Sequence, residues 1–360
     1  MKIAIAGGGT GGHLFPALAV GEVFLERGHE VLIFISEKEV DALAIQGRNE
    51  FRFEKLPSIG MPRLFSPAIF TFFSRFNASL APCRRIFAEF QPDAVLGMGG
   101  FTSTPPILAG KLRRIPTFVH ESNAIPGKAN RLNARLVDVV LLGFEECRRH
   151  FPRARCEVVG TPIRRSLARR LPRAEALAAF GLQPGVPTLL VMGGSQGAHG
   201  INEALRAAAI GGGLLGIQVI HLTGPGDAPA LAQAYREAGV RAHVAAFCHE
   251  MEQAYSAADL VVARSGAASL SEISHFALPS LLIPYPHAAE NHQQFNAEIF
   301  ARAGAAALLN ESQTTGDTLA AAIGTLVRDP SRLQTMAEAC GSLAPRDAAI
   351  CVADTIERFK

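Results

Sequence analysis

The 360-residue chain has few cysteines, and none of them is paired in sequence. Six cysteines are scattered over positions 83, 147, 156, 248, 340 and 351, without a C-x-x-C motif. This pattern argues against a zinc site or a disulfide framework and suits reduced thiols in the cytosol. The sequence also lacks a D-x-D motif and any cluster of His, Asp and Glu with metal-ligand spacing. We therefore predict no bound metal.

Long apolar runs are missing as well, although 48% of the residues are hydrophobic. The uncharged stretch 207–226 contains seven glycines or prolines together with Gln218 and His221, a composition that excludes a transmembrane helix there. The first residues are one lysine and a few apolar side chains before a run of glycines, which does not resemble a signal peptide. We therefore expect a cytosolic protein with neither a transmembrane helix nor a signal peptide.

Charge is unevenly divided between the two halves. Residues 1–173 carry 25 Lys and Arg against 15 Asp and Glu, whereas residues 174–360 carry 10 against 17. The basic half is compatible with an anionic surface or a polyanionic ligand, but also with an ordinary solvated face.

Glycine is concentrated in the stretch Gly7-Gly8-Gly9-Thr10-Gly11-Gly12-His13. It follows the apolar run 2–6, which predicts a buried strand, and precedes an apolar stretch that predicts a helix. Glycines let the backbone turn tightly and approach a ligand, and a helix start offers N–H groups to a phosphate. The pattern therefore favours a phosphate-binding turn over a turn that binds nothing.

Two interpretations of this turn remain open from its own residues. Gly7, Gly9 and Gly12 fit the dinucleotide fingerprint G-x-G-x-x-G, and Glu37 follows a second apolar run, as in a nicotinamide-dependent oxidoreductase. His13 instead favours a site of proton transfer, because imidazole titrates near neutral pH and lies directly after the loop.

The first half alternates apolar runs with longer segments that can form helices. Strands are predicted at 2–6, 31–35, 94–97, 117–119 and 138–142. This alternation is typical of a parallel sheet covered on both faces. The turn 97–100 and the polar residues His120-Glu121-Ser122-Asn123 each follow a strand, so we expect them at one edge with the first glycine turn.

The second half repeats the plan after an arginine-rich linker at 163–173. Residues 188–199 again give an apolar strand, a glycine loop and a histidine, and further strands are predicted at 217–222, 243–247, 260–263 and 280–284. Such self-similarity predicts two related α/β domains. The turn into a helix at 263–272 is suited to phosphate. The amides and acids of 284–297 are suited to the hydroxyls of a sugar.

A phenylalanine-rich stretch interrupts the first half. In a helix, Phe65, Ile69, Phe72, Phe73 and Phe76 would form one apolar stripe, and arginines flank it. The stripe is compatible with packing on the sheet and with resting on an anionic bilayer.

Seven blocks, taken in order, resemble the MurG family of glycosyltransferases nearly end to end. They are 8–13, 97–100, 120–123, 161–164, 193–198, 264–272 and 293–297. The resemblance implies a GT-B fold, with two Rossmann-like parallel-sheet domains facing a central cleft. It implies an N-terminal acceptor domain at 1–162, a donor domain at 163–344 and a C-terminal helix at 345–360 that packs back on the first domain. It also implies inverting, metal-independent transfer of GlcNAc from UDP-GlcNAc to lipid-linked muramyl-pentapeptide in peptidoglycan synthesis, with no cofactor.

The resemblance also assigns roles to residues. His13 would be the general base on the acceptor 4-hydroxyl. Ser195 and Arg164 would contact the UDP portion, the backbone near Cys248 would face uracil, Glu272 would hold the ribose, and helix-end N–H groups would meet the diphosphate. The remaining implied contacts to donor or acceptor are Thr10, Gly11, Gly12, Asn123, Ala267, Ala268, Ser269, Gln293 and Gln294.

The resemblance further implies a place on the cytoplasmic face of the inner membrane, held peripherally through the stripe and its arginines. An anionic membrane surface and cell-wall synthesis proteins are the partners expected beside the two substrates, and no nucleic acid is expected. The chain departs from the family at Ser122, Thr161 and Ala268, and has one arginine in the loop 59–63. Another GT-B sugar transferase, the oxidoreductase and a non-catalytic UDP-sugar-binding scaffold are the alternatives.

Overall fold

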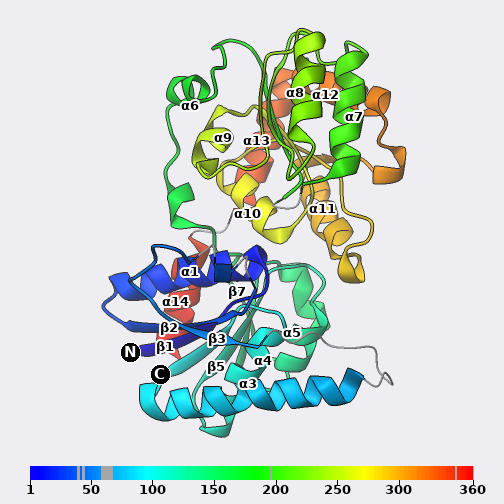
Figure 1. The fold of residues 1–360 in the computed structure, drawn as a ribbon. Helices are drawn as coiled ribbons and strands as arrows, with labels where there is room; N and C mark the ends of the chain where they lie inside the picture. The colour runs from blue at the N-terminus through cyan, green and yellow to red at the C-terminus, as the bar shows by residue number, and fades with distance from the viewer. Residues whose placement is uncertain (39–40, 43–44, 58–67, 195–196, 345–346, 360) are drawn as a thin grey trace. The chain divides into compact units, whose positions relative to one another are not determined.

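The computed structural model describes residues 1–360 except 39–40, 43–44, 58–67, 195–196, 345–346 and 360. It divides the chain into two compact units, one of Met1–Arg164 with Pro345–Lys360 and one of Arg165–Ala344 (Figure 1). Each unit contains one parallel sheet with helices, as the alternation in the sequence predicts.

The first unit is built on a seven-stranded sheet with the order β3-β2-β1-β4-β5-β6-β7. Its strands are β1 (Lys2–Ala6), β2 (Glu30–Ser36), β3 (Arg52–Leu56), β4 (Ala94–Gly97), β5 (Thr117–Glu121), β6 (Val139–Leu142) and β7 (Cys156–Val158). Its helices are α1 (Gly11–Glu26), α3 (Ala68–Phe90), α4 (Thr104–Leu112), α5 (Lys128–Asn133) and α14 (Ala348–Arg358). The five strands predicted for this half are confirmed, and β3 and β7 lie outside the five predicted ranges. The β3 sequence RFEKL is charged because it forms an edge, where one side of the strand lacks a neighbour.

The central strand β1 is buried on both faces of the sheet. Ile3 and Ile5 join one buried cluster with α1 and α14, while Ala4 and Ala6 join another with α3 and α4. A strand buried on both faces has to be apolar throughout, which is the run that the sequence displays. The loops that follow β1, β4 and β5 therefore emerge at one edge of the sheet.

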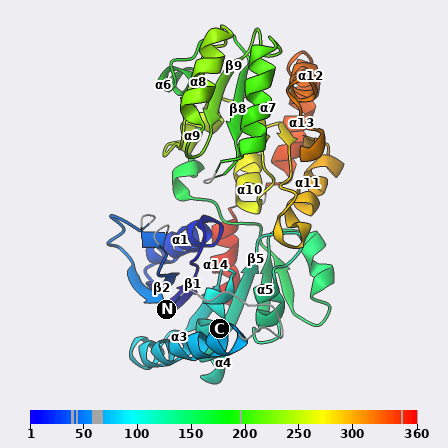
Figure 2. The same ribbon diagram turned by 45° about the vertical axis from the view of Figure 1, so that its right-hand side comes forward.

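The C-terminal helix α14 packs on α1 within the first unit, and Figure 1 and Figure 2 both show the two helices side by side. Val352, Ala353 and Ile356 are buried in the same cluster as β1. Arg27, which directly follows α1, pairs with Asp354 and Glu357 of α14 at 2.7 Å each. The apolar face and the ion pairs together account for the return of the chain to its first sheet.

The second unit has a six-stranded sheet with the order β10-β9-β8-β11-β12-β13. Its strands are β8 (Thr188–Met192), β9 (Gln218–Leu222), β10 (Ala242–Ala245), β11 (Leu260–Ala263), β12 (Ser280–Leu282) and β13 (Ala306–Leu308). Its helices are α6 (Arg173–Ala179), α7 (His199–Ile210), α8 (Ala228–Glu237), α9 (Met251–Ala257), α10 (Ala267–His275), α11 (His292–Arg302), α12 (Gly316–Val327) and α13 (Pro330–Ser342). The short edge strand β13, sequence AAL, carries too little pattern to be predicted.

The arginine-rich segment 163–173 is more ordered than an exposed linker. Arg165–Ala168 form a short 3-10 helix, Leu167 is fully buried, and this turn contacts α9. Most of the arginines face solvent around the single buried residue Leu167, so the arginine-rich composition gave no indication of this packing.

The phenylalanine-rich stripe lies partly outside the described residues, which resume at residue 68. There α3 begins, and its side chains are described from Ser74 onward. Within the part of the chain that the structure describes, none of the helices combines the length and apolarity needed to cross a bilayer.

Candidate active site

The first glycine turn joins β1 to α1 and is closely packed on its neighbours. A Cβ at Gly7 would lie 2.5 Å from the Ala17 Cβ, and one at Gly8 would lie 2.4 Å from the backbone nitrogen of Ser36. Gly9 has a φ of +98°, which side chains disfavour. Thr10 then caps α1 with extended backbone, and Gly11 and Gly12 form the first turn of the helix. Contact distance therefore requires glycine at Gly7 and Gly8, and backbone conformation favours it at Gly9.

His13 projects from this first turn onto the second glycine turn. A Cβ at Gly99 would lie 2.9 Å from both Cδ2 and Nε2 of His13, and one at Gly100 would lie 3.3 Å from Nδ1. Nδ1 is also 3.2 Å from Oγ1 of Thr10. The ring is half-buried, and burial lowers the pKa of His13, with the Asp41 charge opposing and the Lys38 charge adding to that shift. The structure thus brings together Thr10, His13 and the 97–100 turn.

The residues after β5 form a buried polar network at the same sheet edge. Both oxygens of Glu121 accept hydrogen bonds: Oε1 from the backbone and side-chain nitrogens of Asn123 at 2.9 and 3.1 Å, and Oε2 from Gly127 N at 3.0 Å and Asn130 Nδ2 at 2.9 Å. Burial raises the pKa of Glu121, while these donors oppose the rise. The network holds Asn123 in place. Asn130 was missed by the sequence analysis, since it lies on a short helix without a recognisable motif.

His120 is buried beneath that network and does not resemble a base. Its Nε2 lies 2.8 Å from the Gly160 carbonyl oxygen and its Nδ1 lies 3.3 Å from Ser122 Oγ. Burial lowers the pKa of His120 to about 4. A neutral ring with both nitrogens engaged in the protein is structural, which distinguishes it from His13.

Arg164 belongs to the first unit, at the end of the segment that follows β7. Its guanidinium carbon lies 4.9 Å from the centre of the Phe15 ring of α1. The contact is of cation–π type and sets the guanidinium near the start of α1.

The second unit presents a comparable edge at the carboxyl ends of β8, β10, β11 and β12. Gly194 and Gly197 of the loop after β8 have φ values of +87° and +76°, and a Cβ at Gly197 would lie 2.1 Å from the Thr223 carbonyl oxygen. Ser195, which the resemblance assigns to UDP, lies outside the described residues. Cys248, after β10, is 9% exposed and follows the strand by three residues.

Helix α10 begins at this edge, directly after β11. Its first turn contains Ala267, Ala268 and Ser269, whose N–H groups lie at the positive end of the helix dipole. Glu272 follows one turn later, and its Oε2 accepts a hydrogen bond from the Tyr255 hydroxyl at 2.7 Å. The tyrosine therefore orients the carboxylate that the resemblance assigns to the ribose.

The two adjacent glutamines of α11 have different environments. Oε1 of Gln293 accepts a hydrogen bond from Tyr285 N at 3.0 Å, which ties the 285 loop to the helix. Nε2 of Gln294 instead donates to Oε1 of Glu298 at 3.0 Å, along the helix surface. Arg264, the first residue of the block 264–272, donates to the carbonyls of Ile283 and Pro284 and pairs with Glu311.

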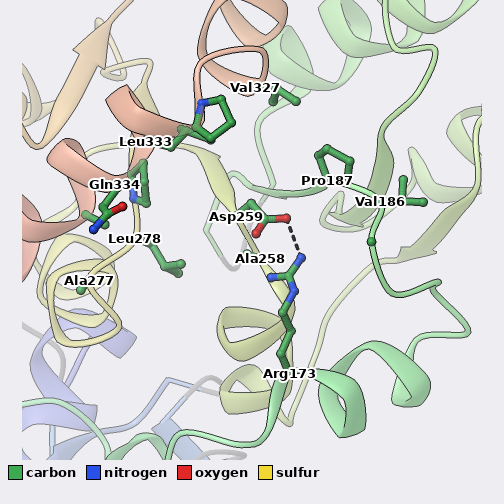
Figure 3. Close-up of a pocket in the computed structure, with 14 residues that line it drawn as sticks. Arg173, Val186, Pro187, Ala258, Asp259, Ala277, Leu278, Val327, Leu333 and Gln334 are labelled. Atoms are coloured by element: carbon green, nitrogen blue, oxygen red, sulfur yellow. Dashed lines mark hydrogen bonds and ion pairs between the residues drawn. The ribbon is translucent and has the colours of Figure 1, made fainter.

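A hollow of about 510 Å³ in the second unit lies away from these loops (Figure 3). It is lined by residues that precede β8, β11 and β12, such as Pro187, Ala258 and Pro279, so it sits at the amino-terminal edge of the sheet. Its polar feature is the pair of Arg173 and Asp259, with an N–O distance of 2.6 Å. Ligands of open parallel sheets bind at the opposite edge, so this hollow is not the candidate active site.

Each half of the chain matches a known protein family. Residues 3–142 match the Glycosyltransferase family 28 N-terminal domain and residues 188–350 match the Glycosyltransferase family 28 C-terminal domain. Proteins named UDP-N-acetylglucosamine--N-acetylmuramyl-(pentapeptide) pyrophosphoryl-undecaprenol N-acetylglucosamine transferase are similar to the chain. That of Geobacter sulfurreducens is 40% identical over 98% of this chain and 97% of its own length, and that of Halothermothrix orenii is 39% identical over 94% and 93%.

A solved structure gives the same result for the fold. The crystal structure of Acinetobacter baumannii MurG covers 99% of both chains with a TM-score of 0.79 and 27% identity. The expected GT-B fold class is confirmed, and the oxidoreductase alternative is not favoured. The chain belongs to glycosyltransferase family 28 and, within it, to the MurG family of N-acetylglucosamine transferases.

Proposed function

We propose that this chain transfers N-acetylglucosamine from UDP-GlcNAc to the 4-hydroxyl of undecaprenyl-pyrophosphoryl-MurNAc-pentapeptide, in peptidoglycan synthesis. The observation that carries the proposal is the 40% identity over nearly the full length of a transferase with that name. The loops at the carboxyl edges of the two sheets contain residue types that such a reaction requires: a histidine, a carboxylate, and helix N–H groups that can meet a diphosphate.

His13 is the general base in this proposal. Its lowered pKa keeps the ring neutral near pH 7, and a neutral nitrogen can accept the acceptor hydroxyl proton as the sugar bond forms. Nδ1 is engaged by Thr10, so Nε2, against Gly99, is the nitrogen assigned to the substrate. Asn123, held by Glu121, and the N–H groups of Gly11 and Gly12 serve the acceptor side.

The donor belongs to the second unit in this proposal. Glu272 binds the ribose hydroxyls, the first turn of α10 and Ser195 meet the diphosphate, and Gln293 and Gln294 read the sugar. The leaving UDP gains negative charge, and helix N–H groups together with Arg164 stabilise that charge without requiring a metal. Inversion follows if the hydroxyl attacks from the side opposite UDP.

The decisive experiment is a UDP-release assay with UDP-GlcNAc and the lipid-linked acceptor. We expect release that requires both substrates. Release with soluble acceptors but not with the lipid-linked one would support a different sugar transferase, and no turnover despite UDP binding would support a scaffold. In parallel, UDP should raise the melting temperature and NAD should not.

A substitution at Gly99 tests the placement of the base. An alanine Cβ would lie 2.9 Å from the His13 ring at a backbone φ of +103°, so the ring has to move. We expect Gly99→Ala to lower kcat by ~10-fold or more, because small displacements of a catalytic group are costly. Gly28→Ala is the matched control in the same unit: its φ is also positive, at +76°, and its Cβ would meet nothing within 4 Å. Equal kcat values for the two variants would contradict this placement.

We also propose that the first unit rests on an anionic membrane surface through the stripe 65–76 and its flanking arginines, at the cytoplasmic face. The basic excess within this unit supports the proposal: residues 1–164 carry 21 Lys and Arg against 15 Asp and Glu. We expect Phe72→Asp with Phe73→Asp to abolish sedimentation with anionic vesicles while the melting temperature stays unchanged. A variant that fails to fold would show instead that the stripe is part of the core.

A further inference from the structure

A buried carboxylate lies beneath the first glycine turn and has no part in the function proposed above. Asp41 is 0% exposed, and its Oδ2 accepts three hydrogen bonds. The donors are the backbone nitrogen of Gly9 at 2.7 Å and the backbone nitrogen and hydroxyl of Ser36 at 2.9 and 2.6 Å. Burying a charge is costly, and these three donors offset part of that cost for the Asp41 carboxylate. It ties the glycine turn to the carboxyl end of β2.

A lysine binds the carbonyl oxygen of the same glycine. Nζ of Lys38 donates to the Gly9 carbonyl oxygen at 3.0 Å, while Asp41 accepts from the Gly9 nitrogen. Gly9 has the positive φ of +98°. The most unusual backbone conformation of the turn is therefore held from both sides by side chains of opposite charge, and both come from the segment after β2.

Both charges also act on the imidazole of His13. The charge of Asp41 raises the His13 pKa and that of Lys38 lowers it, against a larger lowering by burial. The Thr10 hydroxyl and the 99–100 backbone beside the ring are uncharged, and His120 of β5, which interacts electrostatically with His13, is neutral because its pKa is about 4. Among the described residues, Asp41 and Lys38 are thus the charged groups that shift the His13 pKa, in opposite directions and by less than burial does.

We propose that Asp41 and Lys38 are positioning residues for His13, an opposed pair that fixes the Gly9 turn and balances the charge around the ring. Neither side chain is assigned to substrate. The inference rests on the proposed role of His13 only for its consequence in turnover. The contacts to Gly9 and the effect of the two charges on the His13 pKa can both be measured in the protein without substrate.

The test is titration of the His13 ring by NMR in the intact protein, with the variants Asp41→Asn and Lys38→Gln. Asparagine keeps an oxygen for the Gly9 N–H but removes the negative charge, so the imidazolium loses stabilisation and the His13 pKa should fall, by roughly half a unit. Lys38→Gln removes a positive charge, so the pKa should rise by a similar amount. A purely structural role would not move the two variants in opposite directions.

Controls in the same unit sharpen the result. Lys111→Gln, which removes a surface partner of Asp138, should leave the His13 titration unchanged, and Asp41→Glu should restore most of the Asp41→Asn shift. If Asp41→Asn does not fold, the exposed Lys38 still provides the test. Shifts of the same sign, or no shift, overturn the proposal.

Turnover separates this inference from the proposed function. If His13 is the base, the acid limb of the kcat/KM profile moves with its pKa, to lower pH in Asp41→Asn and to higher pH in Lys38→Gln. Opposite NMR shifts with an unmoved acid limb uphold the pair and reject His13 as the base.

Discussion

Replacing His13 by alanine is expected to lower kcat by ~10²-fold or more and to leave UDP affinity nearly unchanged. The imidazole is the neutral group held between Thr10 and the 99–100 turn, and alanine leaves no side chain to accept the hydroxyl proton. UDP affinity should persist because the proposed nucleotide contacts of Glu272 and α10 belong to the second unit. The measurements are steady-state UDP release and calorimetric titration with UDP.

His150→Ala is the matched control for that variant. His150 lies in the same unit, at the end of a 3-10 helix after β6, and is distant in sequence from either glycine turn. Its kcat should equal that of the unmodified protein. An unaltered kcat in His13→Ala would remove His13 from the mechanism, and a parallel loss of UDP binding would show that the variant disturbs more than proton transfer.

Replacing Glu272 by alanine is expected to raise the KM for UDP-GlcNAc by ~100-fold, with a smaller change in kcat. Two hydrogen bonds from ribose hydroxyls to a carboxylate contribute about 3 kcal/mol together, which corresponds to this factor. The carboxylate is oriented by the Tyr255 hydroxyl at 2.7 Å, so Tyr255→Phe should raise KM in the same direction but by less.

Glu237→Ala provides the comparison for Glu272. Glu237 is an exposed residue at the end of α8 that accepts a hydrogen bond from Gln233, and its loss should leave KM unchanged. A KM that is insensitive to Glu272→Ala would reject the ribose assignment. A large fall in kcat at constant KM would instead indicate a contact formed only in the transition state.

Local patterns in the sequence were sufficient for most of the fold. Buried strands such as β1 and β8 are apolar runs because both faces are covered, and the glycine turns are recognisable because contact distance requires glycine. The edge strands β3 and β13 were missed for different reasons: β3 (RFEKL) is charged, and β13 (AAL) has only three residues, so neither shows an apolar run long enough to be recognised.

The environments of individual site residues were less predictable. His13 and His120 are both histidines at the carboxyl edge of one sheet, yet one lies against glycine backbone and the other has both nitrogens engaged within the protein. Gln293 and Gln294 are adjacent, yet they bond to a loop and to their own helix. Sequence spacing places a residue on an element but does not select its partner.

The sequence by itself determined the two-unit parallel-sheet plan, the glycine turns and the candidate base, because strand burial and tight turns leave their mark on consecutive residues. Only the tertiary structure decided that Asp41 and Lys38 hold Gly9, that Glu121 holds Asn123 through a network with Asn130, and that Tyr255 orients Glu272. Most of these contacts join residues far apart in the chain, and parallel crossovers bring such residues to one sheet edge without any local signal that names the pair.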